Sequence, residues 1–134
     1  MKNESIENAL SFHIPDRLLD GPLLTFDLPE VIKKIKQEQT WKMGERNAIT
    51  LMKSSYMRIV LIALHEQTEM NFLQSGNVIS IQLIEGKLNF QTEKQSAMLR
   101  KGGLLTLHED MKHTLIAIEE SVFLLTVSIC PADQ

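Results

Sequence analysis

Three histidines of this chain lie where apolar stretches end, and there imidazole groups could meet at the rim of a β-structure. His65 ends one apolar stretch, His108 ends another, and His113 follows soon after. Imidazole can act as an acid, a base or a hydrogen-bond donor, and it is a common ligand of divalent metals. If the three side chains converge, they form an unusual three-histidine metal site. The sequence does not place them on one rim, so this site is kept as an alternative.

Arg58 directly precedes the most apolar stretch of the chain, residues 59–64. Inside a barrel, its guanidinium could hold a carboxylate through two parallel hydrogen bonds. The competing interpretation is an ordinary ion pair with Glu69 or Asp110 at the rim, and exposed pairs of that kind are common and weak. The sequence leaves both interpretations open.

Consecutive antiparallel strands would position these groups, and the stretch from Asn77 to Val127 has the pattern of such strands. Its runs are short, rich in Val, Ile, Leu, Thr and Phe, and separated by turn formers at regular spacing. This pattern favours an all-β sandwich or barrel. Gly86 lies between two runs, where a tight hairpin demands the positive φ that glycine adopts. The nearly continuous apolar run 57–65 predicts a central strand that is covered on both faces.

One amphipathic helix is predicted before the strands, over residues 28–39. Asp27 stands at the N-cap position with Glu30 three residues later, as in a capping box, and Pro29 suits the first turn. Trp41 follows the helix and is expected to be a packing residue. The predicted organisation is an N-terminal arm with a possible edge strand in residues 1–26, the helix and its connection in residues 27–46, and the barrel in residues 47–130.

Length and composition restrict the classes of partner. The chain has 134 residues, enough for one domain, and a net charge of −3. Without an excess of Lys and Arg, nucleic acid is not the expected partner. Cys130 is the single cysteine, so no internal disulfide forms and a reducing cytoplasm is the expected location. No apolar run is long enough to cross a membrane and no signal peptide is recognised, so we expect a soluble protein with no membrane partner.

From His65 onward, the order of glycines and histidines resembles the small single-domain cupins, a β-barrel family with two motifs. The first motif runs Gly, five residues, His-x-His, three or four residues, Glu, six residues, Gly. The second runs Gly, five residues, Pro-x-Gly, two residues, His, three residues, Asn. Gly86 matches the last glycine of the first motif, and Gly102 and His113 fall in the register of the second. The resemblance covers residues 57–127 and implies a cupin-like antiparallel β-barrel of jelly-roll type with one short N-terminal amphipathic helix.

The first motif is degenerate in this chain. Counting back from Gly86, the glutamate position holds Ile79, and the His-x-His positions fall on Phe72 and Gln74, or on Leu73 and Ser75. Metal ligands in such a site are imidazole or carboxylate donors at about 2.0 to 2.2 Å, and an apolar side chain has no lone pair to offer. Only His113 remains of the family's four usual ligands. In the second motif, the proline, glycine and asparagine positions hold His108, Asp110 and Ala117.

These observations predict a metal-independent protein that binds or senses a small molecule inside the barrel. By the family register His113 points into the mouth, and the candidate binding residues beside it are His108, Arg58 and Gln74. The alternative is a cupin-type enzyme, isomerase-like or dioxygenase-like, that uses His113 as acid or base or a rearranged metal site of His65, His108 and His113. A third, purely structural hypothesis has a barrel that is closed by packing and works through its surface or its dimer face. No cofactor is expected, with a divalent metal as the alternative, and the resemblance implies a homodimer.

Overall fold

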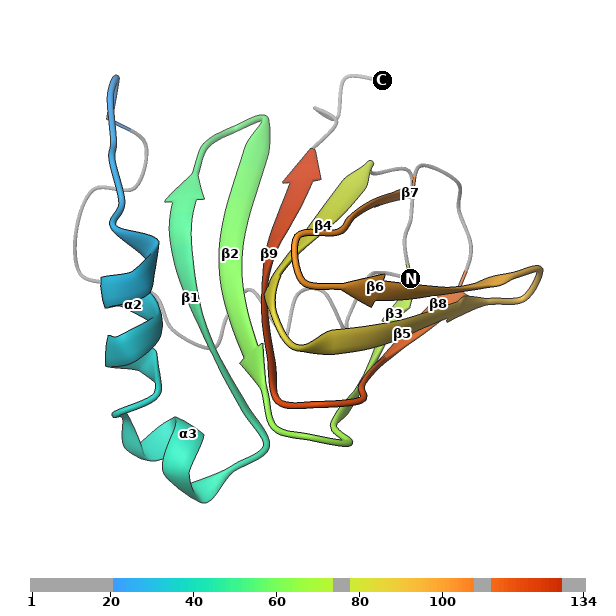
Figure 1. Cartoon of the computed structure of the whole chain (residues 1–134). Coiled ribbons are helices and arrows are strands. Elements are labelled where there is room, and N and C mark those ends of the chain that lie inside the picture. Colours follow the sequence, from blue (N-terminus) through green and yellow to red (C-terminus); the bar gives the residue numbers. More distant parts are fainter. Residues whose placement is uncertain (1–20, 74–77, 108–111, 129–134) are drawn as a thin grey trace.

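The computed structural model of the chain describes residues 21–73, 78–107 and 112–128. These residues form two helices followed by nine strands (Figure 1). The helices are α2 (Leu28–Ile35) and α3 (Gln39–Met43). The strands are β1 (Arg46–Lys53), β2 (Met57–Leu64), β3 (Glu69–Leu73), β4 (Ile79–Glu85), β5 (Lys87–Thr92), β6 (Ser96–Arg100), β7 (Leu104–Leu107), β8 (Lys112–Ala117) and β9 (Ser121–Ser128).

The strands form two antiparallel sheets that pack face to face. The five-stranded sheet has the order β1-β2-β9-β4-β7, and the four-stranded sheet has the order β3-β8-β5-β6. From β2 onward the chain crosses to the other sheet after every strand except β5, which forms a hairpin with β6, in the manner of a jelly roll, and β1 extends one edge. The predicted jelly-roll arrangement is therefore confirmed.

Alternation along each strand divides the five-stranded sheet into two apolar faces. On β2, Val60, Ile62 and Leu64 point into the core between the sheets, whereas Leu61 and Ala63 point to the helical side. All five side chains are fully buried. This strand therefore has the predicted position in the middle of a sheet with both faces covered.

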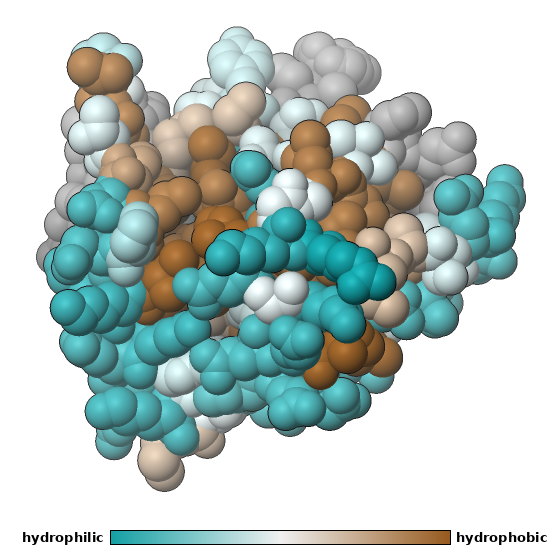
Figure 2. Space-filling view, viewed as in Figure 1, coloured by the Kyte–Doolittle hydropathy of each residue, from teal (hydrophilic) through white to brown (hydrophobic). Residues whose placement is uncertain are grey.

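Helix α2 covers the outer face of the five-stranded sheet at β1 and β2 (Figure 1). The Asp27 carboxylate caps it by accepting a 3.4 Å hydrogen bond from the Glu30 amide. Ile32 and Ile35 are buried against the sheet, while the lysines of the opposite side give α2 a hydrophilic outer face (Figure 2). In the described part of the chain, neither helix has the length and apolarity needed to span a membrane.

The N-terminal elements differ from the prediction in two respects. Helix α2 ends at Ile35, before the predicted residue 39, and the separate short helix α3 carries Trp41. Trp41 is 6% exposed, so its predicted packing role is confirmed. The predicted edge strand after Pro22 is wrong, because residues 21–27 pair with no strand among the described residues. Instead, Phe26 packs against the cluster below the helices.

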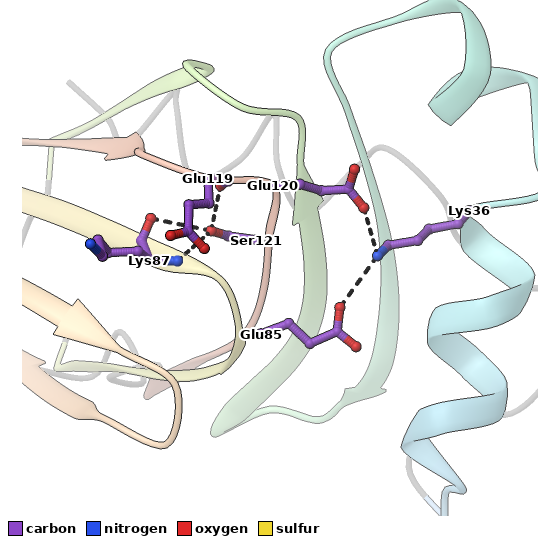
Figure 3. A network of polar contacts seen from close by, with 6 residues as sticks. All are labelled: Lys36, Glu85, Lys87, Glu119, Glu120 and Ser121. Carbon is purple, nitrogen blue, oxygen red and sulfur yellow. Dashed lines mark hydrogen bonds and ion pairs between the residues drawn. The ribbon is translucent and has the colours of Figure 1, made fainter.

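A polar network fixes the end of α2 to the turns of the sandwich (Figure 3). The Lys36 Nζ atom lies 2.8 Å from a carboxylate oxygen of Glu120 and 3.3 Å from one of Glu85. Ser121 joins the same two turns: its hydroxyl accepts a hydrogen bond from the Lys87 amide at 3.1 Å and lies 2.7 Å from the Glu119 carbonyl oxygen, to which it donates. Gly86 has the predicted positive φ, at +96°.

Candidate functional site

His113 points into the interior from the four-stranded sheet. It lies near the start of β8, between Phe72 on β3 and Thr92 on β5. The next inward residues of β8, Leu115 and Ala117, belong to the core, so alternation places His113 on the inner face. Its side chain is 2% exposed, and its ring lies 4.9 Å from that of Phe90 at an interplanar angle of 32°. This imidazole is a buried, inward-facing group next to an aromatic ring.

Arg58 points into the interior from the opposite sheet. It lies near the start of β2, two residues before the inward-facing Val60, and its cross-strand partner is the core residue Val127. The Nε atom is buried and has no hydrogen-bond partner among the described residues. The expected pair with Glu69 does not form, since Glu69 starts β3 and faces Ile116. Asp110, the other expected partner, lies outside the described residues.

Arg58 and His113 lie at the same end of the sandwich, which we call the mouth end. Arg58 heads an inward-facing row that continues through Val127 and Ile79 to Leu107. Residues 74–77 lie between β3 and β4 in the sequence, and residues 108–111 lie between β7 and β8. Each of these short connections can span at most about 18 Å. The first connection joins β3 to β4, and the second joins β7 to β8, so the ends of β4 and β7 that carry Ile79 and Leu107 lie near the start of β8 that carries His113. Arg58 and His113 therefore enter the interior from opposing sheets at one end.

His65 lies at the other end of the sandwich. It follows the last residue of β2, and its carbonyl accepts a 3.1 Å hydrogen bond from Thr68, just before β3. Four residues of β3 then lead to Phe72, the partner of His113, which corresponds to about 13 Å of extended chain. Ligands of one metal ion lie within about 2.3 Å of it. The structure therefore does not bring His65 and His113 together in the alternative metal site.

The His65 ring contacts the helical side instead. It stacks on the Trp41 ring with 3.5 Å between centroids, and its Nε2 atom lies 2.9 Å from the Trp41 carbonyl oxygen. His65 thus helps to pack α3. No group of three or more His, Cys, Asp or Glu within residues 21–73, 78–107 and 112–128 is arranged to hold a metal ion. His108 and Gln74, the other two predicted site residues, lie outside these ranges.

Ile79, at the family's glutamate position, is 1% exposed and belongs to the core between the sheets. The structure thus places a hydrocarbon side chain within the row that begins with Arg58. This position can contribute apolar contacts to a ligand but no lone pair to a metal.

Lys53 is a residue of the mouth end that the sequence did not single out. The pairing of β1 with β2 shifts between Thr50 and Met52, so that Lys53 stands opposite Arg58. Directly paired residues of neighbouring strands face the same side, so Lys53 shares the inner face with Arg58. The one signal in the sequence is the apolar pair Leu51-Met52, which interrupts the alternation of polar and apolar residues over residues 47–53.

Comparisons with known proteins identify the fold. No family model matches the chain, and no curated protein matches it. Among solved structures, a conserved protein of unknown function from Streptococcus pyogenes aligns with a TM-score of 0.66 at 15% identity, over 88% of this chain and 100% of that chain.

Two further solved structures have informative names. A cupin superfamily protein from Desulfitobacterium hafniense has a TM-score of 0.65 at 15% identity, over 85% of this chain and 99% of that chain. Ectoine synthase from P. lautus has a TM-score of 0.61 at 15% identity, over 79% of this chain and 78% of that chain. At such low identities, these likenesses show that the chain has the cupin fold.

Proposed function

We propose that this chain, a cupin fold, binds a small molecule between its two sheets at the mouth end, without a metal ion. The observation that carries the proposal is that Arg58 and His113 enter the interior from opposing sheets at one end. Binding sites typically combine apolar walls with a few convergent polar groups. Here, a guanidinium and an imidazole project among the apolar side chains of Val127, Ile79 and Phe90.

Metal independence is supported by the chemistry of the inward-facing side chains. The glutamate position of the family motif holds Ile79, and His65 packs on Trp41 at the far end of the sandwich. Neither residue can complete a site around His113. A small molecule would then be recognised by hydrogen bonds and charge from Arg58 and His113, together with His108 and Gln74 if these line the mouth.

An enzyme is the second candidate, and the inward position of His113 favours it too. A buried imidazole at the same end of the sandwich as a guanidinium could move a proton on a molecule that the guanidinium orients. One structural neighbour, ectoine synthase, is named as an enzyme, whereas the protein from Streptococcus pyogenes is named as having unknown function. The two candidates differ in what happens to the bound compound.

A screen of small molecules by thermal unfolding tests the proposal. Compounds that raise the unfolding temperature of the wild-type protein should lose at least tenfold in affinity with R58M and with H113Q. R100M is the matched control, since Arg100 is exposed on β6. If the bound compounds are insensitive to both mouth substitutions, the proposal is wrong. NMR spectra of the incubated compound separate the candidates: an unchanged compound indicates binding alone, and a product that H113Q abolishes indicates catalysis.

We also propose that the protein is a homodimer and that it is located in the cytoplasm. It is supported by the family resemblance and by the single cysteine, which suits a reducing compartment. Sedimentation equilibrium should give twice the mass of one chain.

A further inference from the structure

The β-bulge in β1 places a second cation beside Arg58. Thr50 pairs with Val60, and Met52 pairs with Ile59, the next residue of β2, so Leu51 is the extra residue. Leu51 packs on the helical side, where regular alternation would also have directed Lys53. Because the bulge inserts one residue, Lys53 is paired with Arg58 and lies on the inner side of the sheet instead, at the exposed end of β1. Bulges are known to redirect side chains in this way, often next to functional sites.

The β1–β2 hairpin holds the two cations opposite each other. The Ser54 amide donates a 2.9 Å hydrogen bond to the Met57 carbonyl, and the Ser54 hydroxyl accepts hydrogen bonds from the amides of Tyr56 and Met57 at 3.2 Å each. The turn is thus closed by its own hydrogen bonds immediately beyond Lys53 and Arg58. Their backbones cannot separate without breaking these bonds.

Two like charges directly opposite each other on one face of a sheet are destabilising. Among the described residues, no carboxylate forms an ion pair with Lys53 or Arg58. The Arg58 Nε atom is in addition buried without a hydrogen-bond partner in that part of the chain. Within residues 21–73, 78–107 and 112–128, the mouth end therefore pairs two positive charges that no described carboxylate neutralises.

We infer that the ligand of the proposed site is a small organic anion, with an oxyanion head between Lys53 and Arg58 and an apolar body between the sheets. The inference rests on the proposed function and names the ligand class. An oxyanion would supply a counter-charge to the two cations, and the planar guanidinium can hold two of its oxygens at once. The body would lie along Val127 and Ile79, which follow Arg58 in the same inward-facing row. His113 faces this row from the other sheet.

Matched pairs of compounds test the inference. Straight-chain and aromatic carboxylates are each paired with the primary amide of the same carbon skeleton, which keeps the shape and removes the charge. Alkyl phosphates form a third arm that distinguishes the two kinds of oxyanion. By calorimetry, the acids should bind the wild-type protein at least tenfold more tightly than their amides. K53M, which keeps an apolar stem, should lose about tenfold for the acids and nothing for any amide that binds.

K34M is the control variant, because Lys34 is exposed on α2 and lies outside the β1–β2 hairpin. It should bind the acids as the wild type does. Without ligand, K53M should unfold at a higher temperature than the wild type, since it removes the repulsion, and this readout also shows that the variant folds.

Equal binding of acids and amides, or K53M that binds acids as the wild type does, overturns the inference. If acids and amides bind equally and H113Q abolishes the binding of both, the proposed function survives and the charged head is wrong. If no acid binds but neutral compounds of the wider screen do, the proposed function again survives and the inference of a charged head is wrong. If nothing in either set binds, both the inference and the proposed function fail.

Discussion

Gly86 shows at the scale of one residue how closely two turns approach each other. It has a φ of +96°, and a Cβ atom added there would meet the Ser121 hydroxyl, the Glu120 carbonyl oxygen and, at 2.7 Å, the Ser121 Cα atom. We predict that G86A lowers the free energy of unfolding by about 2 to 4 kcal/mol. About 1 to 2 kcal/mol comes from the left-handed backbone, and the rest comes from overpacking. Urea unfolding measures the loss.

Gly102 is the matched control for this prediction. Its φ of +86° is similar, but an added Cβ atom would have nothing within 4 Å. G102A should therefore cost only the backbone term, about 1 to 2 kcal/mol. Equal losses in the two variants would show that the contact of Gly86 with the neighbouring turn contributes nothing.

Asn47 connects the helices to the first strand through a single buried amide. It is 1% exposed, and its Nδ2 atom donates to the Ile35 carbonyl and to the Glu38 carboxylate, both at 2.9 Å. We predict that N47A lowers the free energy of unfolding by about 2 to 3 kcal/mol, because it leaves a buried carbonyl without its donor. Amide hydrogen exchange should accelerate most in α2 and α3.

The half-buried Asn89 on β5 serves as the control for N47A. N89A should change stability by less than about 0.5 kcal/mol. If N47A were equally mild, the helices would be held by their apolar face alone.

At the scale of the element, Lys36 anchors the C-terminal end of α2. Burial lowers the pKa of this ammonium, but the hydrogen bonds and charges of Glu120 and Glu85 outweigh it, so the pKa is raised above 10.5. A raised pKa means that the folded state binds the proton more tightly than the unfolded state. The stabilisation from Lys36 is therefore complete below pH 10.5 and is lost as the pH rises through the folded-state value.

We predict that K36M lowers the free energy of unfolding by about 0.5 to 1 kcal/mol at neutral pH, since both carboxylates are half exposed. The difference from the wild type should stay constant up to about pH 10 and shrink above it. Urea unfolding across this pH range measures the difference. K34M should show no difference at any pH, and a K36M difference that persists in strong alkali would exclude the charged network as its cause.

The elements themselves follow from local signals only in part. The strands could be predicted because turn formers separate short apolar runs, and α2 could be predicted because Asp27 caps an apolar stripe. The bulge at Leu51 could not, because it is defined by the pairing of β1 with β2 and not by β1 alone. The failed strand after Pro22 has the same origin, since an edge strand exists only where a neighbour offers it hydrogen bonds.

At the scale of the whole molecule, topology decides which candidate residues meet. His65 and His113 both lie next to strand ends, but the direction in which each strand runs places them at opposite ends of the sandwich. The local sequence pattern around each histidine does not show in which direction its strand runs within the sandwich. The family register gave His113 its inward position as an expectation, and the structure places its side chain on the inner face. The sequence did not single out Lys53, because Lys53 is relevant to the site only through its pairing with Arg58 across the hairpin, and that pairing depends on the bulge.

The last prediction concerns metal binding by the whole protein. A metal that binds only the folded state stabilises it by about 4 kcal/mol at a thousandfold excess over its dissociation constant. Because Ile79 occupies the glutamate position and His65 packs on Trp41, we predict no such gain. A chelator should leave the unfolding temperature of the untagged protein unchanged. Added zinc should raise the unfolding temperature of the wild type by no more than it raises that of H113Q. Stoichiometric zinc, iron, nickel or manganese that is lost in H113A would contradict this, and would favour an enzyme with a rearranged metal site.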